Sequence, residues 1–276
     1  MTGERPISLY APGSDGTPTG FGRVTHRLRQ LPRVIGRAVR HPAWLIETVR
    51  GIARRRQSAK LAFRLADHAD RFVEPADAVA RATGATEVEA AAALESVWTP
   101  LDDDLGGHPL YGARRELAQI VAAVVTLGRP SVVVETGVAQ GVTTASILRA
   151  LPDGSHLHSI DLPVLDADED DFVGALVPDD LRSSWTLHRG PSRTLLPSLL
   201  ETDGPVDLFV HDADHSYAAQ LEELRTIWPH LRPGGVILMD DVGNPAALEF
   251  AAQVHTDLWL VGNPAHRDAL GILRKA

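Results

Sequence analysis

The second part of the chain alternates between short apolar runs and longer amphipathic stretches. Short runs rich in β-branched residues predict buried strands, whereas apolar residues that recur every three or four positions predict helices. Strands are expected at 131–135, 156–160, 185–188, 207–211, 236–239, 258–261 and 270–273. Helices are expected at 143–151, 192–200, 217–231 and 245–254. This alternation predicts an α/β fold with a doubly wound, mostly parallel sheet of seven strands.

The first part of the chain divides differently. Residues 1–20 are rich in Gly, Pro, Ser and Thr, which predicts a disordered lead-in. Residues 21–108 predict a helical N-terminal region that forms a basic arm, a lid or an oligomerisation element. Within it, 101–108 is acidic and contains glycine, which is typical of a linker or lid. An amphipathic helix at 114–127 then leads into the main domain, which is expected to span 109–276.

Helix start and stop signals refine the N-terminal region. An amphipathic helix is expected at 23–39, with Pro32 either as a kink in it or as its start. A second helix is expected to begin at Pro42 and to continue through Arg54-Arg55-Arg56 toward Leu65. Two short alanine-rich helices should follow between 74 and 98 and should be separated at Gly84. The second of them begins with Thr86-Glu87-Val88-Glu89, which is typical of a capped helix start.

The charge of the chain is unevenly distributed. The net charge is −9, yet residues 21–64 hold twelve Arg and Lys against one acid, Glu47, whereas the rest of the chain from Leu65 holds fourteen against thirty-three acids. We expect the apolar stripe of this basic arm to pack on the acidic body with its basic face in solvent. Contact with a membrane surface or with a second subunit stays open. Nucleic acid is disfavoured, because the arm lacks interleaved aromatic residues.

Composition narrows the class of protein further. The chain of 276 residues is 44% hydrophobic, which is ample for a buried core. It contains no cysteine, which excludes disulfides, thiolate chemistry and zinc held by sulfur. No apolar run approaches the roughly 18 residues of a membrane span, and no signal-peptide core is visible. A cytoplasmic enzyme is therefore expected.

A glycine-containing turn follows the first predicted strand. The strand ends at Glu135, Gly137 and Gly141 form the turn, and a helix opens near Thr143. Glycines let a ligand approach the backbone, and a helix N-terminus offers free N–H groups to an anion. The spacing differs from the Gly-x-Gly-x-x-Gly of dinucleotide folds, which disfavours a nicotinamide oxidoreductase. A purely structural tight turn remains the alternative.

An acid also ends the next predicted strand. A carboxylate at the position of Asp161 can accept both hydroxyls of a ribose, as in nucleotide-binding α/β folds. An isolated aspartate at a strand end is more often a cap or turn residue, so the preceding glycine turn is what favours binding.

Acids and a histidine follow two later strands. Asp212 and His215 follow one strand, and Asp240 and Asp241 follow the next. Ligands of open α/β sheets bind at the carboxyl ends of the strands, so these side chains should converge on one cleft. Asp240 and Asp241 can face the same ligand only if the strand ends there. A solvated turn and a surface histidine are the alternatives, and His211 is expected to be buried against a neighbour.

Together these motifs resemble those of class I S-adenosylmethionine (SAM) methyltransferases, which have a Rossmann-like fold. Glu135-x-Gly137-x-x-x-Gly141 is similar to their motif I, Asp161 to their ribose-binding acid, and 231–235 to the turn before their fifth strand. The resemblance covers about residue 109 to the end. It implies SAM as cofactor, with Ser192 in a segment that resembles the adenine contact and Thr143 near the methionine carboxylate. The SAM-binding set that it implies is Glu135, Gly137, Ala139, Gly141, Thr143, Asp161, Ser192 and Asp212.

The acidic residues resemble the metal site of one branch of that family. Asp212, Asp240 and Asp241 match the divalent-metal ligands of catechol and caffeoyl-CoA O-methyltransferases. Those enzymes carry a general-base lysine three residues after the first aspartate, where this chain has His215. Asp-x-x-His with a later Asp-Asp is similar instead to magnesium-dependent sugar O-methyltransferases of macrolide biosynthesis. The resemblance therefore implies Mg²⁺, His215 as general base, and a sugar or other natural-product hydroxyl as acceptor.

Elementary chemistry is consistent with that implication. An alcohol does not lose its proton unaided near neutral pH, and a divalent cation stabilises the developing alkoxide. Carboxylates are hard ligands suited to Mg²⁺, and parallel strands about 4.8 Å apart can bring them to one ion. Histidine, with a pKa of about 6.5, can accept the proton. A catechol or phenol acceptor and a non-catalytic SAM-binding scaffold remain alternatives. The expected partners are a saccharide acceptor and a second copy of the chain in a homodimer.

Overall fold

The computed structural model describes residues 42–97, 115–162, 172–202, 204–266 and 268–276. The expected lead-in, the helix at 23–39 and the linker at 101–108 lie outside the described residues. Among the described helices, none is both long and apolar enough to cross a membrane.

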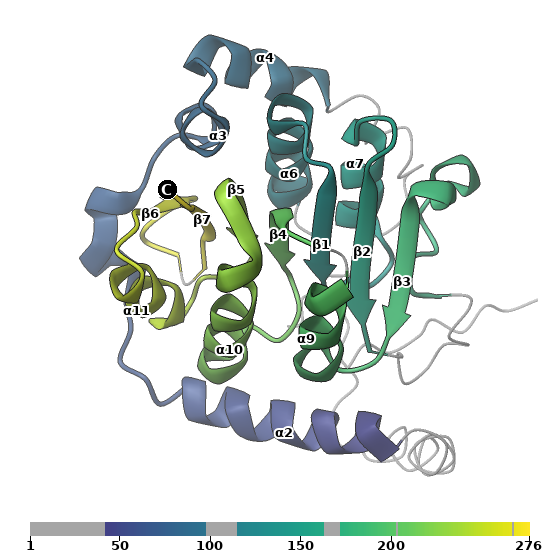
Figure 1. Ribbon diagram of the computed structural model, residues 1–276. Coiled ribbons are helices and arrows are strands. Elements are labelled where there is room, and N and C mark those ends of the chain that lie inside the picture. Colours follow the sequence, from purple (N-terminus) through teal and green to yellow (C-terminus); the bar gives the residue numbers. More distant parts are fainter. Residues whose placement is uncertain (1–41, 98–114, 163–171, 203, 267) are drawn as a thin grey trace, which may run out of the picture.

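Seven strands form one sheet in the order β3-β2-β1-β4-β5-β7-β6, shown in Figure 1. Strands β1 to β5 are parallel to one another, and β7 runs antiparallel to both of its neighbours. The strands are β1 Val132–Thr136, β2 His156–Asp161, β3 Trp185–Arg189, β4 Val206–His211, β5 Leu231–Met239, β6 Leu258–Val261 and β7 Leu270–Arg274. The predicted doubly wound, mostly parallel, seven-stranded sheet is confirmed. The strand order reverses direction between β1 and β4, and this is where such sheets bind ligands.

Helices cover both faces of the sheet because the buried strands are apolar on both sides. Val133 packs in one core cluster with helices α6 (Arg115–Gly128) and α7 (Val142–Ala150), whereas its neighbour Val134 packs in the other. The second cluster holds α9 Ser192–Thr202, α10 Tyr217–Ile227 and α11 Ala246–Gln253. Successive strand residues therefore feed opposite cores, as the two-residue period of a strand requires.

The two alanine-rich helices form as predicted. They are α3 (Pro75–Thr83) and α4 (Glu87–Ser96), and Gly84 ends the first with a left-handed φ of 80°. The expected capping box is present, since Thr86 accepts a hydrogen bond from the Glu89 backbone and the Glu89 carboxylate accepts one from the Thr86 backbone. Their buried alanines belong to the same core cluster as α6, so these helices extend the core of the sheet.

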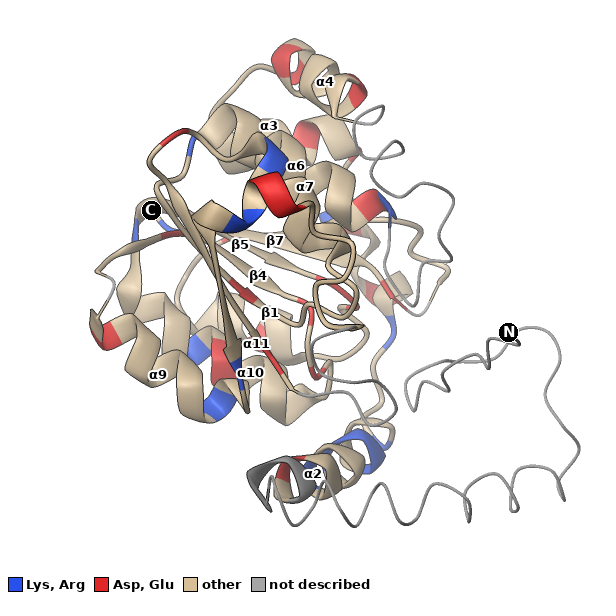
Figure 2. Cartoon of the chain, turned by 90° about the vertical axis from the view of Figure 1, so that its right-hand side faces the viewer, with Lys and Arg blue, Asp and Glu red and all other residues tan. Residues whose placement is uncertain are grey.

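Helix α2 (Pro42–Ser58) begins at the predicted proline. It lies beyond the carboxyl ends of the parallel strands, at the bottom of both Figure 1 and Figure 2. The helix ends at Ser58, so the expected continuation toward Leu65 is wrong. The chain then runs to the edge of the sheet. There the 3-10 segment η1 (Leu65–Arg71) leads into a backbone pairing with β6, where the Val73 N–H donates to the Leu260 carbonyl at 2.9 Å.

The helix expected to run to 231 is shorter than predicted. Helix α10 ends at Ile227 and a 3-10 turn, η3 (Trp228–His230), follows, with Pro229 unable to donate a backbone hydrogen bond. The segment 231–235, expected as a turn, forms the first part of β5. It pairs with β4 through a register shift, since Val206 faces Leu231 and Leu208 faces Val236. A bulged strand start therefore replaces the predicted turn.

Candidate functional site

The turn after β1 is built around two glycines that no other residue could replace without strain. Gly137 and Gly141 have φ angles of 87° and 93°, which disfavour a side chain. A Cβ on Gly137 would stand 1.9 Å from the carbonyl oxygen of Asp212. The Asp212 N–H also donates to the Thr136 carbonyl at 2.8 Å. The turn predicted to hold SAM is therefore in direct contact with the end of β4.

Asp161 holds this turn from the end of β2. Its Oδ2 accepts hydrogen bonds from the N–H groups of Val138 at 2.9 Å and Ala139 at 2.8 Å. Burial raises the pKa of Asp161, although the backbone donors oppose the rise. Ala139 has a left-handed φ of 46°, which those hydrogen bonds help to maintain. The Asp161 carboxylate thus fixes the shape of the turn. Its predicted ribose site would lie next to that turn.

Glu135 is fully buried at the end of β1. Its Oε2 accepts hydrogen bonds from Thr144 Oγ1 at 2.7 Å and from Ser159 Oγ at 2.6 Å. Burial raises the pKa of Glu135 to about 7, against these hydrogen bonds. Its Oε1 accepts none within the described part of the chain. Thr143, on the first turn of α7, is 5% exposed. One oxygen of Glu135 is thus fully hydrogen-bonded, and the other can still accept a hydrogen bond from a ligand.

A buried polar network lies behind the site. His211 Nδ1 lies 2.8 Å from Glu223 Oε2, which also accepts a hydrogen bond from Thr136 Oγ1 at 2.7 Å. Burial alone would raise the pKa of Glu223, but His211, Ser192 and Thr136 lower it overall. His211 is buried against a neighbour as expected, and Ser192 contacts this network. The network connects β1, β4, α9 and α10.

Sequence reasoning missed Glu223. The signal available was an acid on the apolar face of a helix, at the spacing of the buried Ala219, Leu224 and Ile227. A charged residue at such a position is almost never fully buried unless it is paired.

Three predicted site residues converge at the ends of β4 and β5. One ligand atom from each of Asp212, His215 and Asp240 lies within 4.8 Å of the other two. His215 Nε2 is 3.7 Å from Asp212 Oδ1. The Asp240 N–H donates to the His211 carbonyl at 2.9 Å, which keeps the two strand ends side by side. Both strands therefore deliver their polar residues to one place, as the sequence predicted.

Asp241 lies outside that three-residue group. Strand β5 ends at Met239 and Asp241 takes a left-handed φ of 47°, so the strand ends where the sequence required. Burial raises the pKa of Asp212 well above its ordinary value, and the charges of Asp240, Glu135 and Asp241 raise it further. The site thus concentrates negative charge in a partly enclosed space.

The loop that carries His215 is held from two sides. Asn244 Nδ2 donates to the His215 carbonyl at 3.0 Å, and Asn244 Oδ1 accepts from the Ala246 N–H at 2.9 Å at the start of α11. On the other side, Ser58 at the end of α2 accepts a hydrogen bond from the Tyr217 N–H at 2.7 Å. The loop between β4 and α10 is therefore fixed by its neighbours on both flanks.

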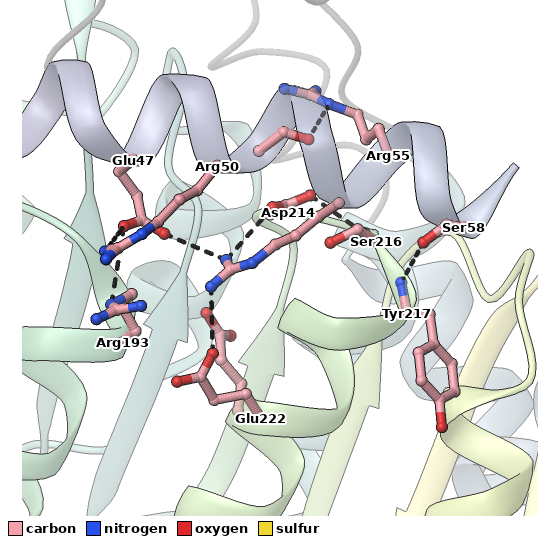
Figure 3. Close-up of polar contacts among 12 residues, drawn as sticks. Glu47, Arg50, Arg55, Ser58, Arg193, Asp214, Ser216, Tyr217 and Glu222 are labelled. Atoms are coloured by element: carbon pink, nitrogen blue, oxygen red, sulfur yellow. Dashed lines mark hydrogen bonds and ion pairs between the residues drawn. The ribbon is translucent and has the colours of Figure 1, made fainter.

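Helix α2 contributes Arg54 to this arrangement, and Figure 3 labels the three acids that it pairs with, Glu47, Asp214 and Glu222. Arg54 lies 3.2 Å from Glu47, 3.7 Å from Asp214 and 3.4 Å from Glu222. Glu47 in turn lies 3.8 Å from Arg193 at the start of α9. Because Asp214 is in the same loop as Asp212 and His215, α2 is connected electrostatically to the site. The sequence indicated a basic arm but not which arginine makes this contact.

Comparison with known proteins agrees with this geometry. Residues 134–242 match the family described as methyltransferase domain. This segment runs from β1 past the end of β5 and includes the glycine turn, Asp161 and the acidic cluster. No curated protein matches the chain.

Several solved structures are similar to the chain. An O-methyltransferase from Bacillus cereus in complex with SAH has 15% identity over 67% of this chain and 91% of that one, with a TM-score of 0.49. A putative O-methyltransferase from Klebsiella pneumoniae has 20% identity over 67% and 90%, with a TM-score of 0.47. The O-methyltransferase TomG from Streptomyces achromogenes, in complex with SAM, has 16% identity over 67% and 90%, with a TM-score of 0.44.

The sheet and its glycine turn define the class of protein as a Rossmann-like methyltransferase fold. Residues 134–242, which make up less than half of the chain, match the methyltransferase-domain family. The resemblance to class I SAM methyltransferases that the motifs indicated is confirmed over this segment.

Proposed function

We propose that this protein is a SAM- and Mg²⁺-dependent O-methyltransferase that methylates a hydroxyl group of a sugar or glycosylated natural product. The observation that carries the proposal is the convergence of Asp212, His215 and Asp240 at adjacent strand ends, next to the glycine turn. A methyltransferase that only donates its methyl group to a strong nucleophile has no need of clustered carboxylates and a histidine.

The donor set suits a divalent cation. Asp212 and Asp240 offer hard oxygen ligands, which Mg²⁺ prefers, and Asp241 lies near enough for its charge to affect Asp212. The pKa of Asp212 is raised by burial and by these neighbouring carboxylates, so a bound cation would relieve repulsion that the folded protein otherwise bears. Asp212, Asp240 and Asp241 would hold the ion, with water and the acceptor completing its coordination.

The glycine turn suits SAM. Gly137 and Gly141 have positive φ angles and no side chains, so a ligand can approach the backbone of the turn closely. Helix α7 begins immediately afterwards and directs its free N–H groups to the same place. Asp161 uses Oδ2 for the turn, and a carboxylate retains further lone pairs for ribose hydroxyls. Glu135, Ala139, Thr143, Ser192 and Asp212 complete the set that would bind the cofactor.

When bound, SAM supplies the activated methyl group and Mg²⁺ supplies positive charge beside the acceptor oxygen. His215 accepts the proton of the acceptor hydroxyl, for which a neutral imidazole near pH 7 is suited. Asp212, 3.7 Å from His215 Nε2, stabilises the imidazolium that results. Asn244 and α2 hold the loop so that His215 keeps its position.

Calorimetric titration with S-adenosylhomocysteine, with and without Mg²⁺, tests the cofactor site without knowledge of the acceptor. We expect micromolar binding, and Asp240→Asn should weaken Mg²⁺ binding while it preserves binding of the cofactor product. No binding in either condition would remove the cofactor assignment.

Turnover tests the metal and the acceptor. A panel of glycosides and catechols assayed with Mg²⁺ should show methylation of glycosides, and EDTA should abolish it. Undiminished turnover in EDTA would end the metal assignment, and methylation of catechols alone would replace the sugar acceptor with a phenolic one.

A further inference from the structure

Helix α2 has the reverse of the usual orientation of a surface helix. The residues that contact the body are Glu47, Gly51, Arg54 and Ser58, whose spacing of four, three and four places them on one face. The opposite face carries Ile46, Val49 and Ile52. The exposed fractions are 51% for Ile46, 59% for Val49 and 47% for Ile52. For these three residues, the expectation that the apolar stripe packs on the body is therefore wrong.

These residues are exceptional in the part of the chain that the structure describes. Only five large hydrophobic residues are exposed there, and three of them lie on this one face of α2. Scattered exposed hydrophobic residues need no explanation, but a cluster on one helix face marks a surface for a partner. We call this cluster of Ile46, Val49 and Ile52 the outer stripe.

Among the described residues of α2, the charged side chains that are exposed are all basic. Glu47, the acid of α2, is turned toward the body and its side chain is 11% exposed beside Arg54 and Arg193. Arg56 lies on the same face as the stripe, four residues after Ile52, and is exposed. Lys60, just after the end of the helix, is exposed as well. Arg50 and Arg55 lie toward the other face, since Arg50 pairs with Glu47 at 3.4 Å and Arg55 donates to the Gly51 carbonyl at 3.3 Å. An incoming surface would therefore meet apolar side chains framed by positive charge.

We propose that the outer stripe docks on a lipid bilayer that contains anionic lipids. An interfacial helix buries its apolar face at the boundary of headgroups and acyl chains, while Lys and Arg reach up to the phosphates. A two-fold contact between two copies with parallel helices fits less well, because it would bring Arg56 of both copies together. The proposal stands apart from methyl transfer and does not depend on it.

Flotation of the full chain with lipid vesicles tests the docking surface. We expect the protein to float with vesicles of phosphatidylcholine mixed with phosphatidylglycerol, to float weakly with phosphatidylcholine alone, and to dissociate as salt is raised. The double variant Val49→Ser/Ile52→Ser should lower partitioning by roughly tenfold or more, since both side chains lose their burial in the bilayer. Arg56→Gln/Lys60→Gln should lower it by a similar factor on anionic vesicles only.

Val88→Ser is the matched control, because Val88 is a 79% exposed valine on α4, away from the outer stripe. It should leave partitioning unchanged, and circular dichroism should show that every variant is folded. Wild-type protein that floats with neither kind of vesicle would overturn the proposal. Equal flotation of wild type and Val49→Ser/Ile52→Ser would overturn it too, since residues elsewhere would then bind the lipid. A dimer that the same double variant converts to monomer, without vesicle binding, would assign the stripe to a second copy.

Discussion

At the scale of single residues, the glycine turn and the acidic cluster depend on each other. The missing side chain of Gly137 leaves room for the Asp212 carbonyl, and the Asp212 N–H is bonded to the residue just before that glycine. A change at Gly137 is therefore expected to affect both the cofactor turn and the residues that follow β4.

Gly137→Ala should abolish binding of S-adenosylhomocysteine and destabilise the fold by several kcal/mol, because its Cβ would overlap the Asp212 carbonyl. Gly154→Ala is the matched control, since Gly154 has a similar φ of 79° with nothing within 4 Å of the added Cβ. It should cost only the strain of a left-handed φ, about 1 kcal/mol. Chemical denaturation and calorimetry measure both. Equal losses in the two variants would show that the overlap has no effect.

His215→Ala should keep binding of S-adenosylhomocysteine and lose methyl transfer by about 10²- to 10⁴-fold in kcat, as expected for removal of a general base. His266→Ala, in an exposed loop, is the control and should behave like wild type. Steady-state assays with an accepted glycoside give the comparison. Full activity of His215→Ala would exclude the histidine from the chemistry.

Reasoning from strand ends predicted which site residues come together, but not how their neighbours hold them. Asp212 and Asp240 could be placed because parallel strands end at one edge. The conformation of Asp241 could not, since a left-handed φ in a non-glycine residue depends on what surrounds it. The place of Glu223 on the apolar face of its helix was visible in the sequence, but its partners were not, since Thr136 lies 87 residues before it and His211 lies 12 residues before it on another element.

At the scale of elements, helix α2 shows the limit of hydrophobic periodicity. The pattern correctly predicted a helix from Pro42, but periodicity identifies the apolar face without identifying what that face meets. In the part of α2 whose side chains are described, polar contacts rather than buried apolar side chains line the side that faces the body. Arg54 makes the largest set of them.

Arg54→Gln should loosen α2 from the body, because Asp214 and Glu222 lose their shared cation. We expect faster amide hydrogen exchange over 42–58, equivalent to about 1 kcal/mol of local stability. Arg50→Gln is the control. The Arg50 side chain is 47% exposed, and of the three acids that pair with Arg54 it pairs only with Glu47, at 3.4 Å. It should change exchange little. Identical exchange in Arg54→Gln and wild type would show that other contacts hold the helix.

At the scale of the whole molecule, the alternation of strands and helices predicted the architecture, and the structure agrees. Two features were beyond the sequence: the placement of β7 between β5 and β6, and the sharing of one core by α3, α4 and the sheet. Both depend on contacts distant in sequence that local patterns do not encode. The division of the chain into regions, the homodimer and the cytoplasmic location stay predictions.

Global stability should fall as pH rises from about 4.5 to about 7, because the pKa of Glu135 is raised by burial from 4.5 to about 7. The folded state then binds more protons than the unfolded state in that window, and the loss is complete above it. The shift corresponds to roughly 3 kcal/mol. Urea unfolding at pH 5 and pH 8 should show a smaller decrease in Glu135→Gln than in wild type.

The exposed Glu201→Gln serves as the control for that comparison and should follow wild type at both pH values. An unchanged pH dependence in Glu135→Gln would mean that Glu135 is charged in the folded protein across the whole range.

The position of β7 has a consequence for the order in which the protein can be made. It is the last strand along the chain, yet it lies between β5 and β6 and pairs with both. On the ribosome, β6 emerges before β7 and can pair only with the short segment at Phe72 and Val73, and the edge of β5 stays open until residues 270–274 appear. Mutations that slow pairing of β7 should therefore leave the edge of β5 unpaired for longer during synthesis, so that it can associate with other chains. The yield of soluble protein should then fall even where the native fold tolerates the mutation.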